Sequence, residues 1–309
     1  MQPSAENRSP SQPPAIQKLG TIDSDIVEIT PVVFHEKLYR FEYIRSNYYN
    51  NQTGNSYFRF VDHASGETTP AFAAGYHLGC AFAFDDTMYV YGVEEWGGNR
   101  IQVFWSKDLQ QWNTGLALDL PGWRIFNTSV CKGKDAFTMA FEIDAPPEET
   151  GSGFTIRFAS SSDLLHWALT PSDCVYTKKH YSACPYLHYL DDGYYYMIYL
   201  HPYAGPAYKP HIVRSKDLVE WESSSLNPVL MYSDDDKKIA NPRLSPEQQK
   251  KIAEAVDINN SDVDLCEYRG KVVINYSWGN QQGTEFLAEA EYAGSLDSFF
   301  HAYFPEKKD

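Results

Sequence analysis

The heptapeptide SKDLVEW, which runs from Ser215 to Trp221, occurs in three related copies along the chain. SKDLQQW spans Ser106 to Trp112, and SSDLLHW spans Ser161 to Trp167. The central aspartates of the three copies are 55 and 54 positions apart. A repeat of this length is typical of an array of similar supersecondary units. The motif therefore predicts the fold before it predicts any chemistry.

Each copy follows an apolar strand and, before that, a hairpin rich in β-branched and aromatic residues. In the second repeat the hairpin reads GCAFAFDDTMYVYGV (79–93) and the strand RIQVFW (100–105). Hairpins at residues 30–44 and 262–278 predict a first and a fifth unit. The prediction is an all-β fold, a five-bladed β-propeller with four antiparallel strands per blade. SPEQQKKIAEAVDI (245–258) predicts one short helical insertion between blades four and five.

The repeated motif itself favours a structural role. Its aspartate can accept backbone N–H groups in a turn, and its leucine and tryptophan can fill the seam between blades. We therefore assign no chemistry to the three aspartates, and we expect Trp112, Trp167 and Trp221 to be structural.

Composition limits the domain organisation and the partners. Residues 1–20 are rich in Pro, Ser and Gln and predict a disordered N-terminal arm, which leaves residues 21–309 as a single propeller domain. A net charge of -15 argues against nucleic acid as a partner. No apolar run is long enough to span a membrane, so no membrane partner is expected. No signal peptide is visible, which predicts a cytoplasmic protein, or a periplasmic or secreted one if a signal has been removed.

The SxDLxxW motif after an apolar strand, together with DDGYYYMIYL (191–200) in a preceding hairpin, resembles the five-bladed propeller glycoside hydrolases. These are the relatives of arabinanases, xylosidases, invertases and levansucrases, including families 43, 32, 117 and 130. The resemblance covers residues 26–304. It implies three carboxylates at the starts of three innermost strands: a base Asp, a modulating Asp and an acid Glu. Those positions fall near Thr30, Asn127 and Ala183, none of which is an acid.

Carboxylates are nevertheless concentrated at the predicted ends of inner strands. Asp262 and Asp264 stand at i and i+2 where one strand opens, and Glu142 and Glu42 close strongly apolar runs. Glycoside hydrolysis needs a protonated acid and a second carboxylate. We therefore predict the catalytic groups among these four residues. The alternative for any one of them is a surface or capping carboxylate.

Further residues are predicted to bind substrate at the same end of the funnel. SWGNQQGTEF (277–286) combines an indole with amide side chains that can both donate and accept hydrogen bonds. The alternative for this stretch is a plain polar loop, and His77 could equally be a hydrogen-bonded structural residue. The candidates are His77, Asn127, Arg157, Glu94, Trp278, Asn280, Gln281, Gln282 and Glu285.

The cysteines predict packing and no metal. Cys80, Cys131, Cys184 and Cys266 fall in successive innermost strands, but no CxxC pair is present, so small buried side chains around the axis are favoured over zinc. No cofactor is expected. A calcium ion in the axial channel is an open alternative, although the sequence contains no recognisable calcium-binding loop.

The resemblance implies an exo-acting, inverting glycoside hydrolase that removes a terminal sugar from an oligosaccharide or small glycoside. Because the expected acids are missing, a non-catalytic carbohydrate-binding propeller is the alternative. A family-130-type glycoside phosphorylase is the third reading. The oligomeric state is not predicted.

Overall fold

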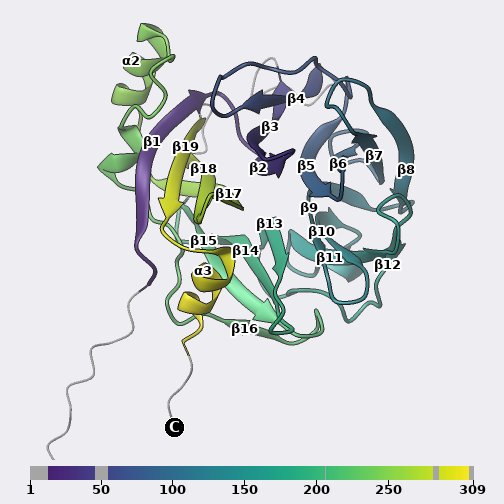
Figure 1. Ribbon diagram of the computed structural model, residues 1–309. Helices are drawn as coiled ribbons and strands as arrows, with labels where there is room; N and C mark the ends of the chain where they lie inside the picture. The colour runs from purple at the N-terminus through teal and green to yellow at the C-terminus, as the bar shows by residue number, and fades with distance from the viewer. Residues whose placement is uncertain (1–12, 46–54, 206, 281–284, 306–309) are drawn as a thin grey trace, which may run out of the picture.

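The computed structural model describes residues 13–45, 55–205, 207–280 and 285–305. Five antiparallel sheets stand around one axis, with their innermost strands in mutual contact (Figure 1). The predicted five-bladed propeller is confirmed. From the axis outward, the sheets contain β2 (Ile29–Phe34), β3 (Lys37–Arg45) and β4 (Ser56–Asp62) in blade one; β5 (His77–Phe84), β6 (Thr87–Val93), β7 (Arg100–Ser106) and β8 (Asn113–Asp119) in blade two; and β9 (Arg124–Lys132), β10 (Phe137–Ala145), β11 (Thr155–Ser161) and β12 (Ala168–Leu169) in blade three.

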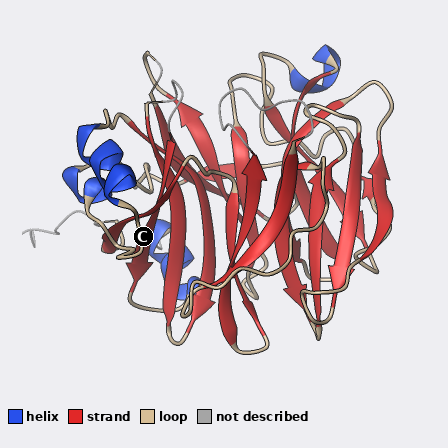
Figure 2. Cartoon of the chain, turned by 90° about the horizontal axis from the view of Figure 1, so that it is seen from above, coloured by secondary structure: helices blue, strands red, loops and turns tan. Residues whose placement is uncertain are grey.

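The last two blades complete the ring. They contain β13 (Ala183–Tyr189), β14 (Tyr195–Pro202), β15 (Tyr208–Ser215) and β16 (Trp221–Ser223) in blade four; and β17 (Asn259–Tyr268), β18 (Lys271–Gly279), β19 (Glu285–Tyr292) and β1 (Ile16–Ser24) in blade five. Figure 2 shows the strands of the ring from the side. Among the described residues, blade one is the exception to four strands: it contains three, and isolated bridges at Thr68 and Phe72 line the outer edge of β4.

The N-terminal strand closes the ring. β1 pairs antiparallel with β19, so blade five is built from both ends of the chain (Figure 1). The predicted disordered arm of residues 1–20 is therefore wrong for residues 16–20, while residues 1–12 lie outside the described residues. The backbone N–H groups of β1 find partners on β19, which outweighs the polar composition of the segment.

The fifth repeat ends differently from the prediction. Its last part, expected as an outer strand, is the helix α3 (Leu296–Tyr303), in which Ser295 caps the N-terminus by accepting from the backbone N–H of Ser298. The helix buries Phe299, Phe300 and Tyr303. The predicted insertion between blades four and five is present as α2 (Pro246–Glu254), with η1 (Asp234–Lys237) before it, and a short α1 (Pro147–Thr150) follows β10. No helix in the described part of the chain is long and apolar enough to cross a membrane.

The repeated motif forms the same hydrogen-bonded corner in three blades. In blade four the hydroxyl of Ser215 accepts from the backbone N–H of Leu218 at 2.9 Å, and Asp217 Oδ1 accepts from those of Val219 and Glu220 at 2.9 Å. The corners at Ser106 and Ser161 repeat this pattern. The structural interpretation of the aspartates is confirmed.

Each motif tryptophan packs against the preceding blade. Trp112 stacks on Phe72 with ring centres 3.9 Å apart, Trp167 meets Tyr91 at 5.6 Å, and Trp221 stacks near Phe158 at 5.7 Å. These contacts lie in the seams between blades, as the motif predicted.

Candidate active site

The end of the axis at which the innermost strands begin carries an unusual backbone. Leu78, Cys184 and Asp262 have left-handed φ angles of 54°, 48° and 48°, and each lies in a register shift between the first two strands of its blade. Glu28, directly before β2, has a φ of 54°. A β-bulge redirects a side chain, and left-handed residues other than glycine are costly and cluster at functional sites. Two of the four residues held this way are acids.

These strand starts surround a small pocket, which we call the mouth pocket. Its volume is about 20 Å³, enough for about one water molecule. Blades one, two, three, four and five all contribute to its wall. It is lined by Glu28, Ile29, Gly79, Asn127, Thr128, Cys184, Pro185, Asp262 and Asp264.

Glu142 on β10 lies directly behind this wall. Its Oε2 accepts two hydrogen bonds, from Asn127 Nδ2 at 3.0 Å and from the backbone N–H of Cys184 at 2.9 Å. Burial raises the pKa of Glu142 to about 8, against these hydrogen bonds and with help from the negative charges of Asp262 and Glu28. The carboxyl group is therefore protonated at pH 7, and because Oε2 accepts twice, the proton belongs on Oε1.

Glu28 is the second perturbed acid. Burial raises its pKa to about 7, and the charge of Asp262 adds to this effect, although the guanidinium of Arg45 lies 2.9 Å away and opposes it. Arg45 is held in turn by two aromatic rings, with its guanidinium carbon 4.9 Å from the centre of Tyr43 and 5.2 Å from that of Trp96.

Asp262 and Asp264 complete the group of carboxyls. Asp262 accepts from the hydroxyl of Ser261 at 2.5 Å. Asp264 accepts from Thr30 Oγ1 at 2.8 Å, and burial raises its pKa to about 7. The structure thus brings together three of the four predicted catalytic residues, Glu142, Asp262 and Asp264.

The fourth predicted acid, Glu42, lies elsewhere. Its fully buried carboxylate is held by Arg40 and Arg59, each with Nε 2.7 Å from one of its oxygens, and Asp23 of β1 joins this network through Arg40 at 3.6 Å. Glu42 and Arg59 are register partners on neighbouring strands. The residue thus connects strands of blade one and does not line the mouth pocket.

Three of the predicted substrate-binding residues do not line the mouth pocket and contact other parts of the chain. Arg157 is fully buried, pairs with Glu149, and donates to the backbone carbonyls of Cys174, Thr170 and Pro171. Glu94 is exposed and lies 3.6 Å from Arg100. Trp278 is fully buried, donates to Thr21 Oγ1 at 2.8 Å and stacks on Phe286.

The remaining predicted residues differ in their distance from the mouth pocket. Asn127 lines it, whereas His77 is buried outside its wall, with Nδ1 2.5 Å from the hydroxyl of Tyr43. Asn280 is half-buried just beyond β18, and Glu285 is buried at the start of β19. Gln281 and Gln282 lie outside the described residues.

Sequence reasoning missed Glu28. This acid stands two residues before Thr30, and Thr30 is the position at which the resemblance implied the first carboxylate. The feature that could have revealed Glu28 is its position directly before the apolar run ITPVVF. The other two implied positions lie at or beside Asn127 and Cys184, and both of those residues donate to Glu142. None of the three implied positions therefore carries an acid itself; Asp264 accepts from Thr30, and Glu142 of β10 accepts from Asn127 and Cys184.

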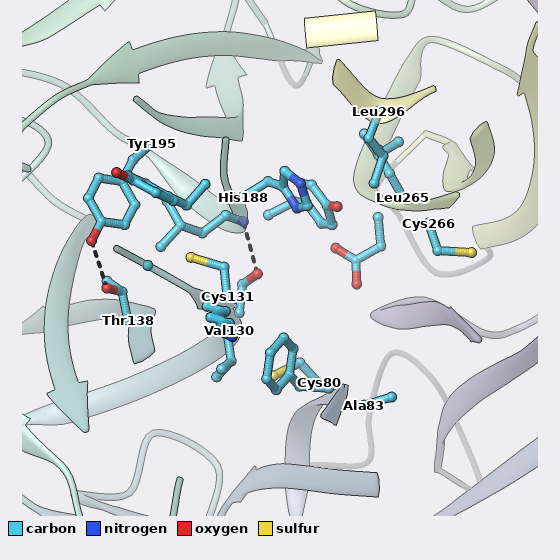
Figure 3. Close-up of a pocket in the computed structure, with 18 of the residues that line it drawn as sticks. Cys80, Ala83, Val130, Cys131, Thr138, His188, Tyr195, Leu265, Cys266 and Leu296 are labelled. Carbon is cyan, nitrogen blue, oxygen red and sulfur yellow. Dashed lines mark hydrogen bonds between the residues drawn. The ribbon is translucent and has the colours of Figure 1, made fainter. Parts of the chain in front are cut away.

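The opposite end of the axis holds a much larger cavity of about 1180 Å³. Cys80, Cys131 and Cys266 line it, and Figure 3 shows their sulfur atoms together with His188. All five cysteines are free. Asp264 lines both this cavity and the mouth pocket. Within the described ranges, no group of three or more His, Cys, Asp or Glu side chains is arranged to hold a metal ion.

Comparison with solved structures identifies the fold. No protein-family model and no curated protein matches the chain. A structure titled "Glycoside hydrolase" superposes with a TM-score of 0.63 at 14% identity, covering 89% of this chain and 91% of that one. A xylan β-1,4-xylosidase from Bacillus halodurans gives a TM-score of 0.58 at 13% identity, over 92% of this chain and 55% of that one. The chain has the five-bladed propeller fold of glycoside hydrolases.

A third similar structure was solved with a sugar bound. It is an α-L-arabinofuranosidase from Podospora anserina in complex with cellotriose, with a TM-score of 0.59 at 9% identity. The superposition covers 92% of this chain and all of that one.

Proposed function

We propose that the protein is a glycoside hydrolase that cleaves a terminal sugar from a small glycan. One observation carries the proposal: acids of blades one and five line the mouth pocket, and directly behind its wall lies Glu142 of blade three, whose pKa is raised by burial to about 8. A protonated acid beside a further carboxylate is what glycoside hydrolysis requires. The oligosaccharide complexes of structures with the same fold support a glycan as the ligand.

The proposed roles follow from the protonation states and positions. Glu142 donates its proton to the glycosidic oxygen as the bond to the anomeric carbon breaks. Asp262 takes a proton from the water that adds to that carbon. Glu28, which pairs with Arg45, adds negative charge close to Glu142 when it is ionised, and this charge helps to raise the pKa of Glu142.

We propose inversion of configuration and attack at the chain end. The mouth pocket has room for about one water molecule beside Asp262 and Glu28, as a direct attack by water needs. Proton NMR of the first product formed would show the opposite anomer to that of the substrate. The same anomer would exclude inversion.

The test uses nitrophenyl glycosides and short oligosaccharides with matched variants. Once a substrate is found, we expect Glu142→Gln and Asp262→Asn to lower kcat by about 10²–10⁴, because each removes a proton-transfer group and keeps the shape. Glu220→Gln is the control, since Glu220 is exposed in the corner turn of blade four and lies outside the mouth pocket. Full turnover in both mouth variants would refute these assignments.

Binding without turnover is the second candidate. The observation that favours it is the size of the mouth pocket, which holds a water molecule and not a sugar ring. Sugar binding measured by calorimetry, with no product from any glycoside in the panel, would support this reading. Phosphorolysis would show as turnover that depends on added phosphate.

A further inference from the structure

A continuous row of rings runs around one side of the mouth. Trp96, Phe126, Phe154, Tyr181 and Tyr208 follow one another with ring centres 6.3, 5.1, 5.5 and 5.5 Å apart. We call these five residues the aromatic arc. They come from blades two, three and four, and they stand at strand ends or in loops at the end where the innermost strands begin.

The arc is only partly covered by the rest of the chain. Phe126 is buried, but Trp96, Phe154, Tyr181 and Tyr208 are each half-buried. Large apolar rings that keep part of their surface open around a polar site are a common form of ligand wall. His77 supports the first ring edge-on, with its centre 6.0 Å from that of Trp96.

The arc borders the carboxyl group of Glu142. Phe126 precedes Asn127, which donates to Glu142, and the charge of Glu142 contributes to the raised pKa of Tyr181 after the larger effect of burial. Glu28 and Asp262, by contrast, come from blades one and five, which contribute no ring to the arc. The mouth therefore has an aromatic side that includes the protonated acid and a charged side that includes the other two acids.

We propose that the aromatic arc binds the leaving-group side of the substrate, as the platform for an uncharged sugar unit linked to the one that is cleaved. This inference rests on the proposed function. A general acid protonates the oxygen of the leaving group, so the leaving group lies on the side of that acid. Here that side is the aromatic one.

The chemistry of the arc specifies a neutral unit. Its five rings carry no charge at pH 7, and burial lowers the pKa of the adjoining His77 to about 4, so that this ring is neutral as well. In the part of the chain that the structure describes, two cations lie beside arc rings, and each has an acidic partner: Arg45 beside Trp96 is paired with Glu28, and Arg124, 5.7 Å from the ring centre of Phe126, lies 3.3 Å from Asp144. An acidic sugar would meet the charges of Glu28 and Asp262, whereas the C–H face of a neutral sugar can stack on an open ring.

The experiment separates the leaving group from the sugar that is cleaved. Tyr208→Leu and Phe154→Leu are compared with the unmodified protein on an oligosaccharide and on the glycosyl fluoride of its terminal sugar. Fluoride departs without contacting a platform. We expect kcat/KM for the oligosaccharide to fall about threefold to tenfold in each variant, because its leaving group loses one ring contact. We expect kcat/KM for the fluoride to stay within about twofold, because fluoride makes no such contact.

Tyr189→Leu is the control, since Tyr189 is a half-buried ring of the same blade that lines the cavity at the other end of the axis. Equal losses on both substrates in the arc variants, or no loss on either, would overturn the inference. Failure of the proposed function would look different, because the unmodified protein would then release no product from any glycoside or glycosyl fluoride.

Discussion

At the scale of single residues, the most informative side chain is Glu142. Its carboxyl group is nearly excluded from water, yet two donors hold one of its oxygens in place. Burial of an acid favours the neutral form, and the charges of Asp262 and Glu28 act in the same direction. The features that suit the residue for proton donation also make it costly for the fold.

That cost predicts a pH dependence of stability. In the unfolded chain Glu142 ionises near pH 4.5, whereas in the fold its pKa is about 8, so the unfolded state binds fewer protons between these values. The free energy of unfolding therefore decreases as pH rises across this window, and this one group accounts for about 2 kcal/mol between pH 6 and pH 8. We expect Glu142→Gln to lose less stability over that range in urea titrations. Glu94→Gln should follow the unmodified protein, and an equal slope in both variants would contradict the assignment.

The identity of the acids could be predicted only in part from sequence. Asp262 and Asp264 open an apolar strand and were predicted, but the left-handed φ of Asp262, which lies in the register shift of β17, has no signal in the sequence. Glu28 was missed because the strand was expected to begin at Thr30, so Glu28 fell in the turn before it. The left-handed conformation that places Glu28 at the mouth pocket has no signal in the sequence. Glu42 was predicted to be catalytic, but it is buried against Arg40 and Arg59, and alternation along a strand does not show which partners a side chain meets.

At the scale of elements, the corner turns explain why one motif recurs. Each uses a serine hydroxyl and an aspartate oxygen to bind backbone N–H groups that would otherwise lack partners. Because both acceptors act within six residues, the motif could be interpreted from sequence alone. The helix α3 could not be distinguished from a strand by its sequence, because its short apolar run fits both the helical period of 3.6 residues and the strand period of two.

The corner of blade four offers a clean test. Asp217→Ala removes the acceptor of two backbone N–H groups, so we expect a loss of about 1–2 kcal/mol in the free energy of unfolding, as for a lost helix cap. Asp217→Asn keeps an oxygen at this position and should recover most of the loss. Thermal and urea unfolding would measure both variants. A full loss in the Asn variant would indicate that charge, and not the acceptor, matters.

At the scale of the whole molecule, the ring depends on one joint between the chain ends. β1 pairs with β19, and its Lys18 lies 2.7 Å from the buried carboxylate of Asp236 in η1. Asp236 also accepts from the hydroxyl of Tyr276 on β18. This joint could not be predicted from sequence, because β1 is partly polar and far along the chain from its partner.

Gly20 provides the test of this joint. It has a φ of 119°, and a Cβ there would lie 2.3 Å from the carbonyl oxygen of Lys238, so Gly20→Ala must displace β1 from η1. We expect a loss of more than about 2 kcal/mol in stability. Gly193→Ala is the control, since Gly193 has a φ of 86° with no atom near the added carbon. If the two variants lose equal stability, the close packing of β1 is not what matters.

The pairing of β1 with β19 also delays ring closure during synthesis on the ribosome. Roughly 260 residues separate the end of β1 at Ser24 from the start of β19 at Glu285. At ~5–20 residues per second, β1 waits on the order of 13–50 s for its partner to be translated. Asp262 of β17 is also synthesised after all the strands of blades one to four. A nascent chain arrested before Glu285 has neither a closed ring nor a docked first strand, so the propeller is completed only once β19 has been synthesised.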